Sequence, residues 1–386
     1  MRAHVMFLFG VVNGMIMSPP AISTCSVWVV GCGVPKRGMG WYHAKQILDG
    51  EISTAKLTAV VEPWFLGPGS DSPPGKAFGE WAVATKEQGG DVCFCSAVND
   101  VPVDAETPTL ALISGRTADN PRLLREVIDH GCSAVYLEKP GAPTVGELED
   151  MRAYAKEKGV PVYMGYNKNV TPYVRKALEA AKKHPGSTTT YVHNNAYKPD
   201  ELPECFERNA EGMLKNMAIH ELALLATYWG VTVDSIASVT PDSDFSSCET
   251  LTGPSGATFT DFSRVGFVVK TKTSQEIKLL VDRCGSDAGG NSIAIVTKDG
   301  DELFRAETPD DELSQFVEAA AKEDPEMMPY FFLQSNDYKT LKDLTTAHVL
   351  AGADGAPEGV ATIDVAIEAL KVAEYLTPLL QEALKS

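Results

Sequence analysis

The sequence predicts a doubly wound parallel α/β sheet, followed by an α+β domain with a large, mainly antiparallel sheet. Up to residue 166, short apolar runs alternate with amphipathic segments, which is the pattern of β-α-β units with parallel strands. A glycine-rich turn follows the first apolar run, where such sheets bind ligands. Beyond residue 166, strand-like runs follow one another with few helices between them, which favours antiparallel pairing.

The elements of the parallel sheet come first in the chain. We expect strands at Val27–Val30, Leu57–Glu62, Asp91–Val98, Leu110–Ser114, Cys132–Leu137 and Val160–Gly165. We expect helices at Trp41–Asp49, Lys76–Gln88, Pro121–His130 and Val145–Lys158. This alternation predicts a first domain over residues 27–166, with ligand sites at the carboxyl ends of its strands.

The second domain is predicted over residues 167–386. We expect helices at Pro172–Lys183 and Met213–Trp229, and strands at Thr188–Tyr197, Val265–Lys272, Glu276–Asp282 and Ser292–Thr297. The last helix, Thr362–Leu380, carries an apolar face formed by Ile363, Ala366, Ile367, Leu370 and Ala373. Such a face packs against a core, so this helix is not a free tail.

Composition narrows the class of protein. The 386 residues suit two domains, and 34 Lys and Arg against 52 Asp and Glu give a net charge of -18. This balance argues against nucleic-acid and anionic-membrane partners. The eight cysteines include no C-x-x-C pair and no zinc-type spacing, and the seven histidines are scattered. The sequence therefore predicts neither a disulfide framework nor a metal site.

The first 26 residues differ from the rest. A basic residue, Arg2, precedes the apolar run Val5–Met17 and then Ser18-Pro19-Pro20-Ala21. This order resembles a targeting leader and is too short to span a bilayer, while a simple N-terminal extension is the alternative. A leader implies a secretory or organellar protein and an extension a cytoplasmic one. In either case we expect residues 1–26 to add nothing to the folded core.

The glycine turn has the composition of a phosphate-binding turn. Gly31 and Gly33 would let the backbone approach a pyrophosphate, and Gly40 would let the next helix pack closely with its N-terminal amides facing the anion. A standard fingerprint has two residues between its second and third glycines, whereas residues 34–39 intervene here. A glycine-rich turn of another α/β protein is the alternative.

Glu62 strengthens the prediction of a dinucleotide site. It ends the second expected strand, where a carboxylate accepts hydrogen bonds from both ribose hydroxyls of an adenosine, although a solvated surface glutamate is the alternative. A carboxylate there repels the 2′-phosphate of NADP and favours NAD. Lys36, Arg37 and Arg116 oppose that preference, because these cations would neutralise the repulsion near the adenosine phosphates. NAD is therefore expected, with NADP as the alternative.

Two further residues have the chemistry of catalytic groups. His220 lies four residues after Asn216 on one expected helix, so both would occupy the same face. A satisfied core histidine is the alternative for His220. Lys139 follows a buried strand and would point into the ligand crevice, unless it is a solvated loop lysine.

Together these features resemble the glucose-fructose oxidoreductase / inositol dehydrogenase / MocA (Gfo/Idh/MocA) family over about residues 27–386. The resemblance rests on the glycine turn, Glu62, Glu138-Lys139-Pro140, Met164-Gly165-Tyr166-Asn167-Lys168 and Gly212…Asn216…His220. It implies a Rossmann domain and a second domain whose sheet mediates homo-oligomer contacts, as a dimer or tetramer. It also implies reversible hydride transfer between NAD or NADP and a sugar, polyol or related carbonyl or imine compound.

The resemblance also implies roles for single residues. Lys139 is similar to the family lysine near nicotinamide and substrate, and His220 to the acid/base histidine, with Asn216 beside it. The implied cofactor-binding residues are Gly31, Gly33, Lys36, Arg37, Gly38, Gly40, Glu62, Ser114, Arg116, Glu138 and Lys139. The implied substrate-binding residues are Tyr166, Asn167, Lys168, Asn216 and His220.

Three departures from the family pattern bear on function. The glycine turn contains the insertion Pro35-Lys36-Arg37, Asn216 replaces the usual Asp, and Ser114-Gly115-Arg116-Thr117 replaces a Pro-bearing turn. Two other functions therefore stay open beside the dehydrogenase. One is redox-neutral chemistry with bound NAD, such as glycoside cleavage through transient oxidation. The other is a non-catalytic cofactor-binding protein, against which Lys139 and His220 argue.

Overall fold

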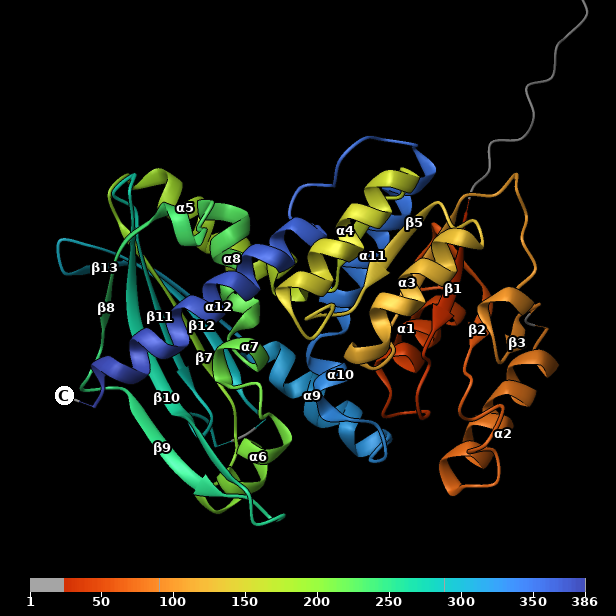
Figure 1. Ribbon diagram of the computed structural model, residues 1–386, viewed down its shortest axis with the longest axis horizontal. Coiled ribbons are helices and arrows are strands. Elements are labelled where there is room, and N and C mark those ends of the chain that lie inside the picture. Colours follow the sequence, from red (N-terminus) through yellow and green to blue (C-terminus); the bar gives the residue numbers. More distant parts are fainter. Residues whose placement is uncertain (1–23, 90, 288, 386) are drawn as a thin grey trace, which may run out of the picture.

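The computed structural model describes residues 24–89, 91–287 and 289–385 (Figure 1). Residues 1–23 of the predicted leader lie outside this range. The predicted boundary at residue 26 is wrong, because the first strand begins at Cys25 and its register with the second strand starts there. Within the described residues, no helix has the length and apolar character needed to cross a membrane.

The first sheet is parallel throughout, as predicted. Its strands are β1 Cys25–Val30, β2 Ala55–Val61, β3 Cys93–Cys95, β4 Thr109–Ile113, β5 Ala134–Leu137 and β6 Val162–Met164. Their order is β3-β2-β1-β4-β5-β6, which is the doubly wound arrangement of a Rossmann domain. The order reverses between β1 and β4, so the ligand crevice is expected beyond the carboxyl ends of these two strands.

Helices lie between these strands. They are α1 Met39–Leu48, α2 Pro73–Glu87, α3 Asn120–Asp129 and α4 Val145–Lys158, with short 3₁₀ turns η1 Val98–Asp100 and η2 Thr117–Asp119. Local signals explain the bounds of α4. The Thr144 hydroxyl caps its first turn by accepting from the Glu147 N–H, and Gly159 ends it with a φ of 71°.

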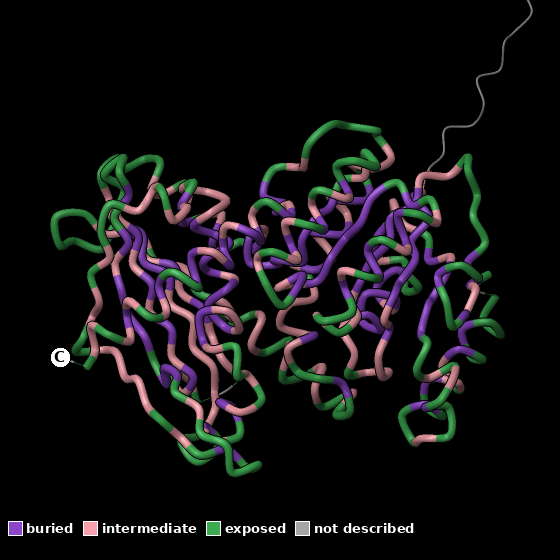
Figure 2. The backbone as a smooth tube through the Cα atoms, viewed as in Figure 1, coloured by how far each residue is buried: buried purple, intermediate pink, exposed green. Residues whose placement is uncertain are grey.

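The second sheet is mixed and mostly antiparallel. Its strands are β7 Thr188–Asn194, β8 Ile236–Pro241, β9 Ser247–Thr252, β10 Thr258–Thr271, β11 Glu276–Asp282, β12 Asn291–Lys298 and β13 Asp301–Thr308. The order is β13-β12-β7-β11-β10-β8, with β9 beside β10, and the β7–β11 pair is parallel. Ile277, Leu279 and Val281 alternate along β11 as buried residues, so one face of the sheet forms the core (Figure 2).

The later helices are α5 Pro172–Lys183, α6 Leu202–Arg208, α7 Met213–Asn216, α8 Ile219–Trp229, α9 Asp311–Glu323, α10 Pro329–Leu333, α11 Ser335–Leu350 and α12 Ile363–Ala383, with 3₁₀ turns η3 Asn167–Val170, η4 Pro199–Glu201 and η5 Val233–Ser235. Helices α5, α6 and α7 contact strands of the second sheet, and α8 and α12 belong to the same buried apolar cluster as its buried face. The predicted apolar face of α12 is confirmed. Its residues Ile363, Ala366, Ile367, Leu370 and Ala373 are all buried.

The single helix predicted over Met213–Trp229 is wrong. It is divided into α7 and α8, because the N–H groups of Met217 and Ala218 both donate to the carbonyl of Met213, at 2.9 and 3.0 Å. A bond that spans five residues inserts one extra residue into the turn and rotates the next part of the helix. Asn216 and His220 therefore do not share a helical face.

Helix α11 returns from the second sheet to the first. It contacts β1, β2 and β4, and the blue helix lies beside the red first strand in Figure 1. Phe331, Tyr338, Leu341 and Val360 belong to the same buried apolar cluster as Val27 of β1. The predicted domain boundary at residue 166 follows the two sheets, and a late segment of the chain nevertheless completes the first core.

Candidate functional site

The glycine turn is packed so closely that side chains do not fit. Gly31 and Gly33 have φ angles of 81° and 75°, which other residues rarely adopt. A Cβ on Gly31 would lie 2.6 Å from the Cα of Gly115 in the turn after β4. A Cβ on Gly40 would lie 2.4 Å from the carbonyl oxygen of Gly31, so the first turn of α1 sits directly against the strand end.

The inserted residues form a small loop whose two ends lie side by side. The Gly38 N–H donates to the carbonyl of Val34 at 2.7 Å, and a Cβ on Gly33 would lie 3.1 Å from the Cα of Gly38. The chain thus leaves after Gly33 and returns beside it at Gly38, the residue before α1. The long spacing of the glycines keeps the phosphate-type geometry in this way.

Glu62 is a buried part of this turn and not a solvated surface residue. Its side chain follows β2 and its residue is 6% exposed. One carboxylate oxygen accepts from the Gly33 N–H at 2.9 Å, and the other from the Trp64 N–H at 3.3 Å. The acid and the turn therefore meet, as the sequence predicts for a ribose-binding carboxylate.

A cavity of about 570 Å³ lies at this end of the sheet. Its lining includes Gly31, Gly33, Glu62, Ser114, Gly115, Arg116, Trp64 and Arg122. The two turns that follow β1 and β4 thus face one crevice at the switch point, and Arg116 brings a cation to it. Its size and its donors suit the adenosine part of a dinucleotide.

Lys36 and Arg37 do not line this crevice. The Lys36 ammonium forms ion pairs with Asp324 at 2.9 Å and with Glu326 at 3.1 Å, and Arg37 is exposed. The structure places the Lys36 ammonium at the segment between α9 and α10, where these two carboxylates pair with it. The sequence alone could not predict these ion pairs, because the two carboxylates lie far from Lys36 along the chain.

Glu138, a predicted cofactor-binding residue, makes a buried contact inside the first domain. Its carboxylate points into the first domain, where Oε1 lies 2.9 Å from Nε2 of the fully buried His43. It packs over Gly165, on which a Cβ would lie 2.7 Å from the same oxygen. Glu138 therefore supports the turn after β5 from behind.

Lys139, in the same turn, faces the second domain. In the part of the chain that the structure describes, no carboxylate lies within ion-pair distance of its ammonium. Burial lowers the pKa of Lys139, and the charge of Lys168 adds to that effect, whereas Glu138, Glu211 and Glu221 oppose it. Lys139 thus lies near charged groups of the second domain.

His220 lies in the same neighbourhood. Its Nδ1 atom is buried without a hydrogen-bond partner among the described residues, and its ring stands edge-on to Tyr166 at 5.9 Å. Burial holds the pKa of His220 well below its usual range, and the charges of Lys139 and Lys168 add to this effect. Lys139 is therefore near enough to His220 for its charge to act on the imidazole.

A buried charge cluster forms the floor of this region. The Lys168 ammonium donates to Glu221 Oε1 at 2.6 Å and to the Ser292 hydroxyl at 2.9 Å, and His193 Nδ1 lies 3.1 Å from Glu221 Oε2. Burial raises the pKa of Glu221, but His193 and Lys168 outweigh it and hold that pKa well below its usual range. The sequence reading missed Glu221, although a carboxylate within an apolar helical stretch was a usable signal.

Unpartnered polar atoms point to a ligand at this cluster. Besides His220 Nδ1, the Tyr166 hydroxyl and Asn167 Oδ1 are buried without partners among the described residues. A small cavity of about 90 Å³ is lined by Asn167, Lys168, His193 and Asp337, and burial raises the pKa of Asp337 to about 7. Buried polar groups normally find partners, so these atoms are available to a substrate.

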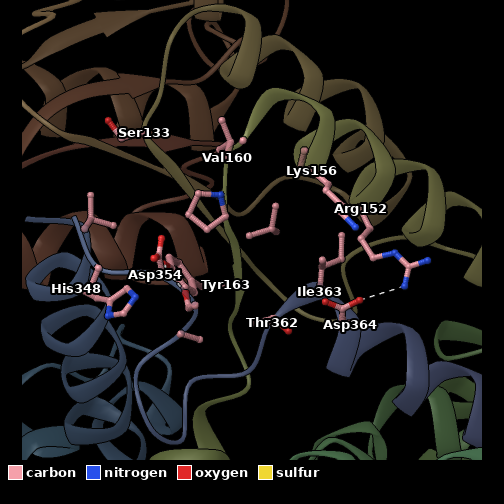
Figure 3. Close-up of a pocket in the computed structure, with 18 of the residues that line it drawn as sticks. Ser133, Arg152, Lys156, Val160, Tyr163, His348, Asp354, Thr362, Ile363 and Asp364 are labelled. Carbon is pink, nitrogen blue, oxygen red and sulfur yellow. Dashed lines mark hydrogen bonds and ion pairs between the residues drawn. The ribbon is translucent and has the colours of Figure 1, made fainter. Parts of the chain in front are cut away.

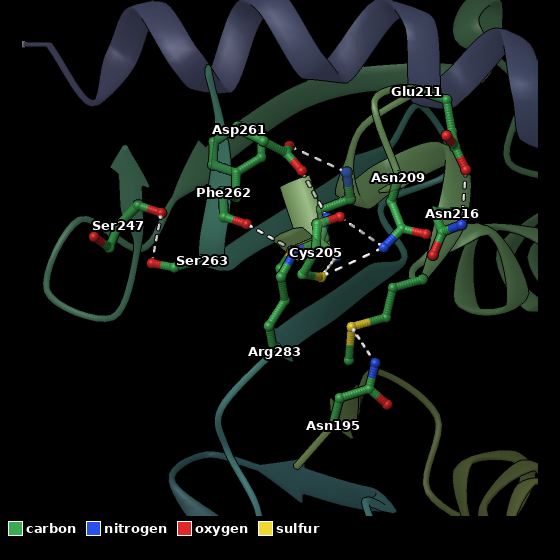
Figure 4. Close-up of polar contacts among 12 residues, drawn as sticks. Asn195, Cys205, Asn209, Glu211, Asn216, Ser247, Asp261, Phe262, Ser263 and Arg283 are labelled. Carbon is green, nitrogen blue, oxygen red and sulfur yellow. Dashed lines mark hydrogen bonds and ion pairs between the residues drawn. The ribbon is translucent and has the colours of Figure 1, made fainter. Parts of the chain in front are cut away.

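The side chain of Asn216 binds Glu211, to which its amide donates at 2.7 Å (Figure 4). The start of α7 is fixed from the second sheet. Asp261 accepts from the Met213 N–H at 3.1 Å and forms a 2.6 Å ion pair with the buried Arg283. Asp261 and Arg283 thereby anchor the chain segment that leads to His220.

The largest cavity described lies elsewhere. It measures about 1,020 Å³ and is lined by Ser133, Val160, Tyr163, His348 and Asp364, among others (Figure 3). Ser133 and Val160 precede β5 and β6, so this cavity opens at the amino ends of the strands. None of the predicted site residues lines it, and ligands of such sheets bind at the opposite edge.

Comparisons with known proteins match the first domain to a family model. The model of the family described as "Oxidoreductase family, NAD-binding Rossmann fold" (GFO_IDH_MocA) matches residues 26–166. No curated protein matches the chain.

Solved structures resemble nearly the whole chain. A scyllo-inositol dehydrogenase from Lactobacillus casei with bound NAD(H) and scyllo-inositol is 14% identical, with a TM-score of 0.64 over 94% of this chain and 97% of that one. A probable dehydrogenase from Thermotoga maritima is 16% identical, with a TM-score of 0.66 over 93% and 97%. A putative myo-inositol dehydrogenase from Sinorhizobium meliloti 1021 is 16% identical, with a TM-score of 0.65 over 93% and 98%. At these identities the likeness shows the fold.

Proposed function

We propose that this chain, whose residues 26–166 match the model of the NAD-binding Rossmann-fold oxidoreductase family, transfers a hydride between NAD and a small polar substrate. The observation that supports the proposal is that the charge of Lys139, from the first domain, acts on His220, from the second, beside unpartnered buried polar atoms. Oxidation of an alcohol needs a base for the hydroxyl proton and a cation for the developing alkoxide.

The crevice residues fit the dinucleotide. Positive φ angles and close backbone contacts at Gly31 and Gly33 suit a pyrophosphate, and the buried Glu62 suits the adenosine ribose. When bound, the nicotinamide supplies the hydride acceptor or donor. We assign NAD as the cofactor because Glu62 would repel a 2′-phosphate and Lys36 is already paired, while Arg116 keeps NADP as the alternative.

The proposed roles follow from charge states. His220 is neutral near pH 7 because its pKa is lowered, so its ring nitrogen can accept the hydroxyl proton of the substrate. Lys139 can remain charged and stabilise the oxyanion that forms. Tyr166, Asn167 and Lys168 would orient the remaining hydroxyls, since two of them carry unpartnered polar atoms.

For the substrate we propose a polyol, a sugar or a related carbonyl compound. Two solved relatives of the fold are named as complexes with NAD(H) and an inositol. The cavity in this chain is small and lined by polar side chains, which suits hydroxyl groups. Loops set pocket shape, so the panel of substrates has to be broad.

A direct assay tests the proposed function. The purified protein is incubated with NAD or NADP and with a panel of polyols and sugars, and in the reverse direction with reduced cofactor and keto or imine compounds. We expect reduced NAD to appear with at least one polyol or sugar. Binding of NAD without turnover on the whole panel would support the non-catalytic alternative, and conversion of a glycoside without net NADH would support redox-neutral chemistry.

We further propose a homo-oligomer formed through the face of the second sheet that lies away from the helices. Leu280 and Ile293 lie on that face and are only partly buried in the single chain. Light scattering on the purified protein would measure the mass, and a monomer at all concentrations would contradict the proposal.

A further inference from the structure

A buried chain of hydrogen bonds runs behind the turn that carries Lys139. Nε2 of His43 lies 2.9 Å from Glu138 Oε1, and Nδ1 lies 2.8 Å from the Lys342 ammonium. Lys342 also donates to Gln46 Oε1 at 2.7 Å. His43 is 0% and Lys342 1% exposed. These titratable groups come from α1 and α11, and neither contacts the crevice or the small polar cavity.

The donor and the acceptor of each hydrogen bond in this buried series can be assigned. The Gln46 amide nitrogen donates to Glu51 at 2.8 Å and to the Ser335 carbonyl at 3.1 Å, so its oxygen faces Lys342. Burial lowers the pKa of Lys342 to about 7, and its ammonium form can only donate, which makes Nδ1 of His43 the acceptor and leaves the proton on Nε2. Burial and the Lys342 charge lower the pKa of His43 to about 4, so the ring is neutral. His43 therefore donates to the Glu138 carboxylate.

Glu138 is held from two sides by this arrangement. His43 binds Oε1 on one side, and Gly165 leaves room for the carboxylate on the other, where any Cβ would collide with it. Among the carboxylates that raise the pKa of Lys139, Glu138 has the largest effect. The orientation of Glu138 thus bears on the neighbouring cation, and His43 and Lys342 determine that orientation.

We propose that His43 and Lys342 are positioning residues that hold the Glu138 carboxylate in one orientation beside Lys139. Helix α11 thereby takes part in setting the geometry and charge of the turn, although it lies behind the site. The inference rests on the proposed function in one respect, which is the role of Lys139 in the reaction.

The test compares two substitutions of His43. In His43→Gln, the amide can still accept from Lys342 and donate to Glu138, whereas His43→Leu can do neither. The readout is the pKa of Lys139 in the cofactor-free protein, taken from the pH dependence of its acetylation by mass spectrometry. We expect His43→Leu to lower this pKa, and Glu138→Gln to lower it as well by removing the negative charge. His43→Gln should keep the wild-type value.

Turnover supplies the second readout. We expect kcat to fall about 10–100-fold in His43→Leu, because a catalytic group displaced by about 1 Å loses that much, and to recover in His43→Gln. NAD affinity should change little in either. His348→Leu is the matched control, since His348 is also a histidine of the first core but lines the opposite cavity; both readouts should stay at wild type.

Two results would overturn the inference. One is a wild-type Lys139 pKa and kcat in His43→Leu, and the other is equal damage in His43→Gln and His43→Leu. If His43→Leu does not fold, His43→Asn replaces it, because the shorter amide cannot reach both neighbours. Absence of turnover in the wild-type protein would contradict the proposed function, and the acetylation measurement would still decide the inference.

Discussion

The crevice beside the glycine turn and the buried charge cluster around Glu221 hold their carboxylates in different ways. Glu62 is bound by the backbone N–H groups of Gly33 and Trp64, all close to the ends of adjacent strands. Glu221 is bound by the side chains of Lys168 and His193, which come from η3 and β7. The first arrangement depends on turn geometry and the second on the docking of separate elements. A turn is encoded locally, whereas a side-chain cluster requires the complete fold.

We predict that substitutions near the Glu221 cluster affect catalysis more than substitutions in the crevice. His220→Ala should lower turnover by about 10²–10⁴, because the imidazole is the proposed proton acceptor. NAD affinity, measured by fluorescence titration, should change little, since the dinucleotide crevice lies in the first domain. Full activity of His220→Ala would contradict the mechanism and make Tyr166 the next candidate for proton transfer.

Glu221→Gln tests the cluster itself. It leaves the buried Lys168 ammonium with a neutral partner, and we expect a loss of about 3–5 kcal/mol in the free energy of unfolding, measured in urea. The pKa of Glu221 is depressed in the folded state, so its stabilisation is complete above the unfolded pKa of about 4.3 and is lost as pH falls below it. The variant should therefore lose less stability than the wild type between about pH 5 and pH 3. Parallel acid profiles would contradict this account.

Gly31→Ala tests the crevice turn. An alanine there adopts an unfavourable φ and also collides with Gly115, so we expect a loss of about 2–5 kcal/mol together with weaker NAD binding. Gly50→Ala is the matched control, because Gly50 has a φ of 74° but no atom within 4 Å of its would-be Cβ. It should cost only about 1–2 kcal/mol. Equal losses in thermal or urea unfolding would mean that the close approach is unimportant.

Glu62→Ala sharpens the assignment of the cofactor. Loss of a carboxylate that binds the ribose should weaken NAD by about 10–100-fold, since hydrogen bonds to a charged group contribute about 1.5–3 kcal/mol. NADP should be affected less, because the variant also removes a repulsion. Calorimetric titration of both cofactors measures this. NADP binding more tightly than NAD in the wild type and unchanged in Glu62→Ala would show that Glu62 does not face the ribose.

Lys36→Met should have the smallest effect. Its ammonium is partly exposed and paired with Asp324 and Glu326, and such surface pairs contribute about 1 kcal/mol or less. We expect unchanged affinity for NAD and NADP, with Arg116→Met as the comparison that does lower it. A marked loss of NADP affinity in Lys36→Met would restore the prediction that this lysine faces the phosphates.

Sequence reasoning succeeded where the signals are local. The helices over Val145–Lys158 and Pro172–Lys183 and the strand Glu276–Asp282 have the predicted bounds, because caps, prolines and alternation act within a few residues. It failed at Met213–Trp229. The hydrophobic period there runs through the break, and the anchor that fixes α7, Asp261, comes from a distant strand.

The sequence by itself determined the parallel sheet, the glycine turn with Glu62, and the candidacy of Lys139 and His220, since backbone geometry and residue chemistry express each of them in a short stretch. Only the tertiary structure decided that Lys36 pairs with Asp324, that Glu138 turns toward His43, and that Glu221 neutralises Lys168. The physical reason is that a charged side chain pairs with the opposite charge or hydrogen-bond donor that folding brings nearest to it. That partner comes from a distant part of the chain in each of these cases.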